Sequence, residues 1–137
     1  MTKRESILSR IQVLLTGVLP AAAPVYRSRV AAYSREETPS ILVSPQSEDT
    51  EPHDSSNELS TLLVDVDIIV RSDTWETDAD VYAAAIHPLI MNDAQLKSMT
   101  VRVRRNSATW ESHEADLTAG TLKATYRVLY FTPPDQI

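Results

Sequence analysis

The sequence contains no cysteine, only two glycines and a single phenylalanine. Without cysteine, disulfide bonds, cysteine-based metal sites and thiol nucleophiles are excluded, and assembly inside a cell is compatible with that composition. Because Gly17 and Gly120 stand alone, no glycine-rich loop can cradle a phosphate group. Tight two-residue hairpin turns are also expected to be few. The usual nucleotide-binding signatures are therefore absent from the sequence.

Positive charge is scarce as well. The chain has 13 lysines and arginines against 19 aspartates and glutamates, a formal net charge of -6. Such a chain lacks the global electrostatic attraction on which non-specific nucleic-acid binding depends, so no specific nucleic-acid binding is expected. No apolar run approaches the roughly 18 residues that a membrane span needs, so no membrane partner is expected either.

The remaining composition is that of a globular domain. The 137 residues are 42% hydrophobic and 23% charged, which predicts a single domain over residues 1–137 with its own core. The N-terminus superficially resembles a secretory signal, with Lys3 and Arg4 ahead of an apolar run. Glu5 and Arg10 interrupt that charge pattern, so a packed helix is the favoured interpretation.

Two segments have helical periodicity. Apolar residues recur at helical spacing up to Val18, and Thr2 with Glu5 has the spacing of a capping box, which predicts a helix over about residues 3–18. The acids between Asp73 and Asp80 favour a helix N-terminus. A second helix is predicted over about residues 77–91, with a proline in its last turn.

Other segments alternate as strands do. The strongest is Leu59 to Arg71, in which every second residue from Leu62 to Val70 is a large aliphatic. At about 3.3 Å per residue this strand spans roughly 43 Å, so we expect it to extend past the core. Shorter strands are predicted over about residues 25–32, 40–44, 99–104 and 121–131.

Two stretches of the sequence are predicted to have no regular secondary structure. Residues 46–58 hold five acids and no large apolar side chain before Leu59, which predicts a mobile acidic loop. Residues 110–116 form a polar excursion. The expected order is α-β-β-β-α-β-β. The expected fold class is α+β, with a mostly antiparallel four- to five-stranded sheet and two helices packed on one face.

Candidate sites are few. Asp65 and Asp67 lie two residues apart on one strand, so both carboxylates leave the same face and are weak candidates for Mg²⁺ or Ca²⁺ ligands. A solvent-facing polar edge is the more economical interpretation, and a subunit-interface ion pair stays open. His53, His87 and His113 have no chelating or catalytic spacing. The sequence predicts no enzyme active site and no cofactor.

Charged and aromatic residues suggest contacts instead. A basic stripe is possible at Arg27 and Arg29 with Arg102, Arg104 and Arg105. It lacks the interleaved aromatics of a nucleic-acid surface, and pairing with acids across strands or subunits is the favoured interpretation. Trp75 and Trp110 each lie in an acidic run, either as a lid over the core edge or as an anchor in a protein–protein contact.

Read together, these stretches resemble the tail-terminator proteins of long-tailed bacteriophages, the U-type minor tail proteins. The resemblance covers nearly the whole length through short motifs. They are Thr38–Val43, the alternation of Leu62–Val70, the turn Ile86–Met91, Trp110, Ala115–Leu117 and Thr125–Tyr130.

The resemblance implies a structural virion protein and no enzyme. It implies a homo-oligomeric ring, commonly of six subunits, that caps the head-proximal end of the tail tube, stops its polymerisation and offers a surface for head joining. The implied partners are further copies, the tail-tube protein and a head-completion or connector protein. The implied location is the virion tail, with assembly in the host cytoplasm.

Within such a ring, opposite charges are the hypothesised subunit contacts. The acids would be Asp65 and Asp67, or Asp73, Glu76, Asp78 and Asp80 at the start of the second helix; the bases would be Arg27, Arg29, Arg102 and Arg104, with Trp110 as an anchor. We expect residues 46–58 at the pore or the tube-facing side. Another head–tail joining, tail-completion or tube protein of the same virion remains open, as does a small-molecule-binding α+β domain.

Overall fold

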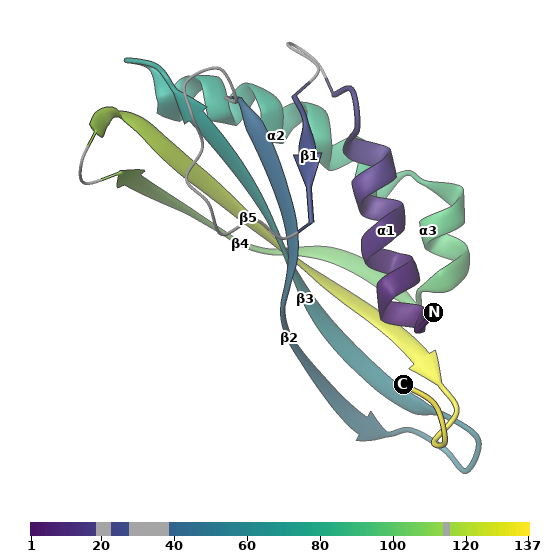
Figure 1. The fold of residues 1–137 in the computed structure, drawn as a ribbon. Coiled ribbons are helices and arrows are strands. Elements are labelled where there is room, and N and C mark those ends of the chain that lie inside the picture. The colour runs from purple at the N-terminus through teal and green to yellow at the C-terminus, as the bar shows by residue number, and fades with distance from the viewer. Residues whose placement is uncertain (19–22, 28–38, 114–115) are drawn as a thin grey trace.

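The computed structural model describes residues 1–18, 23–27, 39–113 and 116–137 (Figure 1). The elements follow one another in the order α1 (Lys3–Leu15), β1 (Val25–Tyr26), β2 (Ser40–Pro52), β3 (Glu58–Arg71), α2 (Trp75–Met91), α3 (Ala94–Met99), β4 (Arg102–His113) and β5 (Asp116–Thr132). The strands form a five-stranded sheet in the order β1-β2-β3-β5-β4. The fold class is therefore α+β, as the sequence predicts.

The sheet is mixed. β2 with β3, β3 with β5, and β5 with β4 are antiparallel pairs. β1 is parallel to β2, with Val25 beside Ile41 and Tyr26 beside Leu42. The expected antiparallel arrangement thus holds for the four long strands. The two-residue strand β1 departs from it, since it runs in the same direction as β2.

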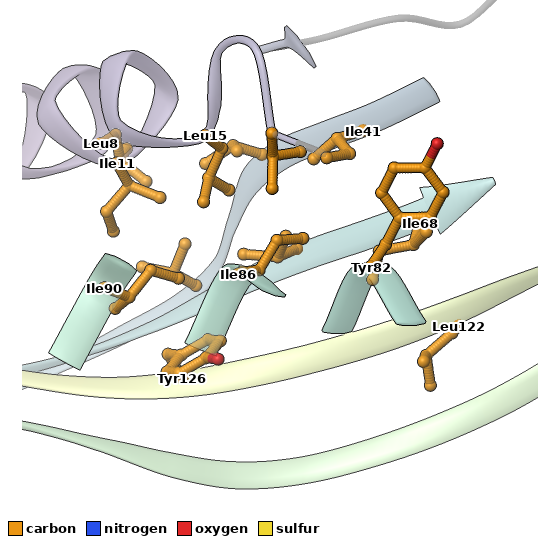
Figure 2. Packing of buried hydrophobic residues seen from close by; sticks show 14 of the residues in the cluster. Leu8, Ile11, Leu15, Ile41, Ile68, Tyr82, Ile86, Ile90, Leu122 and Tyr126 are labelled. Atoms are coloured by element: carbon orange, nitrogen blue, oxygen red, sulfur yellow. The ribbon is translucent and has the colours of Figure 1, made fainter. Parts of the chain in front are cut away.

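One face of the sheet carries the core. The alternating aliphatics of β3 (Leu62, Val64, Val66, Ile68 and Val70) are all buried on this face. Figure 2 shows Leu8 and Ile11 of α1 packed near Ile90 of α2, with Ile86 nearby and Ile68 on the sheet beneath. Each such side chain contributes about 1.5–3 kcal/mol when fully buried. The apolar stripes seen in the sequence therefore form one continuous layer between helices and sheet.

Helix α1 begins as predicted and ends early. The Thr2 hydroxyl accepts a hydrogen bond from the amide of Glu5 at 3.2 Å, which caps the first turn. The helix ends at Leu15 instead of residue 18. Thr16 is extended and Gly17 has a φ of 79°, a left-handed conformation that stops the helix and that glycine adopts without strain. Val18 is nevertheless buried against the core.

The part of the chain that the structure describes has three helices, where the sequence predicted two. The additional helix α3 is only six residues long, and Leu96 is its buried residue. Asp93 caps it, because its Oδ2 accepts from the amide of Leu96 at 2.8 Å. Arg10 of α1 donates two hydrogen bonds to the same carboxylate, at 2.7 and 3.0 Å. A single buried residue gives too little periodicity to reveal such a helix from sequence.

The prediction of a loop over residues 46–58 was wrong. β2 continues to Pro52 and β3 starts at Glu58, so four of the five acids lie on paired strands. The turn between them is held by Asp54, whose Oδ1 accepts from the amides of Ser56 and Asn57 at 2.7 and 2.8 Å. Backbone pairing with β3 needs no apolar side chain on β2. For that reason the polar composition of these residues wrongly predicted a loop.

The prediction of a polar excursion over residues 110–116 was also wrong for residues 110–113 and 116; residues 114–115 lie outside the described residues. β4 extends to His113, and β5 begins at Asp116 and runs for 17 residues to Thr132. β4 is exposed at almost every position, with only Val103 and His113 partly buried. A strand with both faces in water shows no alternation in its sequence.

The long strands extend beyond the layer of helices. In Figure 1 the hairpin of β2 and β3 and the end of β5 reach beyond the N-terminal end of α1. We call residues 46–61 of this hairpin the arm. Glu48 holds the arm against the body, since its carboxylate accepts hydrogen bonds from Arg4 Nη1 at 2.5 Å and from the hydroxyl of Tyr130. Among the described residues, no helix is long and apolar enough to cross a membrane.

Candidate functional site

The two strand aspartates have different environments, although both leave the same face. Asp65 is buried, 6% exposed, and accepts hydrogen bonds from Thr125 Oγ1 at 2.7 Å and Gln46 Nε2 at 3.2 Å. Lys123 Nζ lies 3.8 Å from its Oδ2. The expectation of a solvent-facing aspartate is therefore wrong for Asp65. Its cross-strand neighbour Thr125 and the bulged Gln46 cover it and satisfy its carboxylate.

Asp67 is poorly satisfied. Its Oδ1 is buried and has no hydrogen-bond partner within the described part of the chain. The pKa of Asp67 is raised to about 6, chiefly by burial; the charge of Lys123 opposes this rise, and the charges of Asp65 and Glu111 add to it. The pair therefore shares one lysine ammonium between two carboxylates.

These contacts bear on the weak prediction that Asp65 and Asp67 are ligands of a metal ion. Asp65 already has three polar neighbours, one of which is the cation Lys123. The described residues contain no group of three or more histidine, aspartate or glutamate side chains that could hold a metal ion. Asp65 is thus buried and Asp67 half-buried, and the positive charge that faces Asp65 in this structure is the ammonium of Lys123.

Besides Asp65, two more of the hypothesised contact residues have partners inside the subunit. Arg27 donates to both carboxylate oxygens of Glu5, at 2.8 and 3.1 Å, and this lowers the pKa of Glu5. Asp78 accepts from Ser72 Oγ at 2.6 Å and Thr74 Oγ1 at 3.2 Å. These contacts fasten β1 to α1 and close the first turn of α2. Arg29 lies outside the described residues.

The other acids at the start of α2 are free to meet a partner. Asp73, Glu76 and Asp80 are all exposed. Trp75, from the same run, is buried at 7% exposure and packs directly on Gly120 of β5. Trp75 is therefore a lid on the core edge, one of the two interpretations that the sequence allowed.

A basic cluster lies on the face of the sheet opposite the helices. It consists of Arg102 and Arg104 on β4 and Arg127 on β5, and Arg104 stands directly opposite Arg127. All three side chains are exposed, and no described carboxylate forms an ion pair with any of them. Like charges placed directly opposite across two strands are destabilising, so this cluster favours an anionic partner.

A groove runs between α2 and β4 on the helical face. Its volume is about 620 Å³, and Ala84 and His87 of α2 line one wall while Arg105 and Trp110 line the other. Trp110 is 54% exposed. The groove exists because β4 lies one strand beyond the helix layer, which leaves Trp110 uncovered.

His87 and Tyr126 form the polar contact in this groove. His87 Nδ1 lies 2.9 Å from the hydroxyl of Tyr126, and the two rings stack with centroids 5.8 Å apart. Burial raises the pKa of Tyr126 to about 12, so its hydroxyl stays protonated. Sequence reasoning dismissed His87 as isolated; the pairing depends on the contact between α2 and β5, which the spacing of histidines cannot reveal.

The comparisons with known proteins bear on the fold. No protein-family model matches the sequence, and no curated protein matches it. Among solved structures, one match is a chain of a structure described as "Virion of native gene transfer agent (GTA) particle". The match covers 93% of this chain and 91% of that chain, with a TM-score of 0.55 and 14% sequence identity. The chain therefore shares its fold, over nearly its whole length, with a protein of a virion particle.

Proposed function

We propose that this chain is a structural protein of a virion and that it has no catalytic activity. More specifically, it forms a homo-oligomeric ring at the head-proximal end of a phage tail tube, ends the polymerisation of that tube and presents a surface for head joining. The observation that carries the proposal is the likeness in fold to a chain of a virion particle, which spans 93% of the sequence. The resemblance of the sequence to the tail-terminator family supports the finer role.

The surface of the molecule suits assembly better than catalysis. The arm projects from a small helix-covered body, and β4 is exposed along nearly its whole length. Exposed strand edges are templates for pairing with another chain. The cluster of Arg102 and Arg104 remains a proposed ring contact; Asp73, two residues ahead of α2, and Glu76, in its first turn, are exposed and are not assigned to that contact.

Mass and symmetry of the purified protein test the proposal. A terminator is expected to form one closed ring of fixed mass, and adding it to growing tail-tube protein is expected to shorten the tubes and leave a ring on one end in electron micrographs. A tube subunit would instead form open stacks of variable length. Stacks, or a protein that neither forms rings nor attaches to tubes, would reject the terminator role.

A second candidate rests on the groove between α2 and β4. Its volume of about 620 Å³ lies within the range of roughly 300–1,000 Å³ that is typical of small-molecule sites. His87, Arg105 and Tyr126 supply convergent polar groups. This small-molecule-binding domain would show saturable thermal stabilisation by a compound, lost in a variant that fills the groove (Ala84→Trp), with no dependence on oligomer formation.

A further inference from the structure

The sheet has two free edges on opposite sides. β1 pairs only with Ile41 and Leu42, so beyond Ser44 the outer edge of β2 meets no other strand in the described part of the chain. β4 pairs with β5 on one side and with no described strand on the other. Each edge therefore presents backbone donors and acceptors that a neighbouring strand can use.

These two edges carry opposite charges at the same level of the sheet. One cross-strand row runs from Asp49 on β2 through Thr61 and Leu129 to Arg102 on β4. The ends of this row are three strand spacings apart, about 14 Å, which is too far for an ion pair within one subunit. The acid and the base at the two ends of one row are therefore both available to groups outside the subunit.

The acidic edge has no basic residue near it in sequence. Asp49 and Glu51 are exposed on β2, and no lysine or arginine occurs between residues 39 and 70. On the basic edge, Arg102 and Arg104 are exposed beside Arg127. The repulsion within that basic cluster is relieved if a second molecule brings carboxylates to it. The two edges are thus complementary in charge.

The strand directions also agree with a contact between these edges. β2, β3, β5 and β4 alternate in direction, so β2 and β4 run antiparallel to each other. A neighbouring copy that places its β2 edge along β4 therefore continues the antiparallel alternation of the sheet. In the unshifted register its Asp49 lies level with Arg102.

We propose that the acidic β2 edge of one copy, Asp49 and Glu51, docks on the basic β4 edge of the next, Arg102 and Arg104. The inference rests on the proposed ring and names its subunit contact. Each copy has one edge of each kind, so the contact is head-to-tail, and it forms a closed ring where the rotation between copies closes. The partner surface is a second copy of this chain.

The alternative roles of these charges make different predictions. Charged side chains on an edge strand can shield it from unwanted pairing, in which case removing them increases association. Exposed arginines can also bind the phosphates of nucleic acid, in which case the acids of β2 are irrelevant. A head-to-tail contact is the role in which acids and arginines depend on each other.

Two charge-reversed variants test the contact. The acid-reversed variant carries Asp49→Lys and Glu51→Lys; the base-reversed variant carries Arg102→Glu and Arg104→Glu. All four side chains are exposed, so the fold is retained. At low ionic strength, each variant alone is expected to lose self-association by about tenfold or more in dissociation constant in sedimentation velocity. An equimolar mixture is expected to reassociate, because basic edges then face acidic ones.

A matched variant separates this contact from the start of α2. Asp73→Lys with Glu76→Lys changes the net charge as the acid-reversed variant does, at exposed positions away from both edges. It is expected to associate as the wild type does. Recovery of association in the mixture, with this variant unaffected, supports the contact.

The other outcomes overturn it in distinguishable ways. If the two edge variants associate as the wild type does, or more strongly, the edge contact is wrong while the ring stands. If only the base-reversed variant changes and it loses binding to a duplex DNA probe, the arginines serve nucleic acid. If the wild type stays monomeric at every concentration, alone and on tail tubes, the proposed ring fails and the contact with it.

Discussion

Replacing Asp67 by asparagine is expected to stabilise the protein at neutral pH. Asp67 Oδ1 is buried without a hydrogen-bond partner in the described chain, and burial raises the pKa of this carboxyl from 3.8 to about 6. The folded state therefore holds the proton more tightly than the unfolded state does. An amide of the same shape carries no charge and removes that penalty.

The sign and size of the effect follow from proton linkage. Because the folded pKa lies above the unfolded one, stability from this group is highest below about pH 4 and declines as the pH rises to about 6. A shift of about 2 units at about 1.4 kcal/mol each gives an upper bound of roughly 3 kcal/mol. Water reaches part of this side chain and screens it, so we expect about 1–2 kcal/mol at pH 7.

Urea denaturation at pH 7 and at pH 4 measures the effect. Asp67→Asn is expected to raise the free energy of unfolding at pH 7 and to change it little at pH 4. The matched control is Asp65→Asn, which is expected to lose stability at pH 7 because Asp65 accepts from Thr125 and faces Lys123. A loss of stability in Asp67→Asn at pH 7, or an equal gain at both pH values, would refute the reasoning.

Three further substitutions test the packing and the caps. In Gly120→Ala the new Cβ would lie 2.4 Å from the Trp75 ring, and the overpacking is expected to cost about 1–3 kcal/mol in chemical denaturation; adding Trp75→Leu should recover part of it. Asp93→Ala removes the cap of α3 and is expected to lower the free energy of unfolding by about 1 kcal/mol. Because Arg10 lowers the pKa of Asp93, thermal melts should show this destabilisation at neutral pH, and the difference from the wild type should disappear in acid. Tyr130→Phe removes the hydroxyl that holds the arm, so hydrogen exchange of residues 46–61 should speed up by about tenfold, and unchanged exchange would show that this bond does not seat the arm.

Much of the helix-covered body was predictable from sequence. α1, β3 and α2 were each found within a few residues, because each buries one face and its apolar residues repeat at the matching period. The α+β class follows from that order of elements. A segment that is buried on one side shows this in its sequence as a regular spacing of apolar residues.

Segments without a buried side were not predictable in this way. The distal half of β2 and nearly all of β4 are exposed on both faces, so backbone pairing alone makes them strands. Asp65 and Asp67 look alike in sequence, yet Thr125 and Gln46 satisfy the first while the second is left with a buried unpaired oxygen. The register of β3 on β5 and the bulge near Gln46 decide this difference, and neither has a local signal.

The opposite placement of the two tryptophans gives the protein a built-in pair of optical reporters. Trp75 is 7% exposed and Trp110 is 54% exposed, and the sequence has no third. Blue-shifted emission therefore reports on the core at Trp75, and emission that iodide quenches reports on the groove at Trp110. Unfolding and coverage of the groove by a partner can thus be followed separately in one cuvette, without a label.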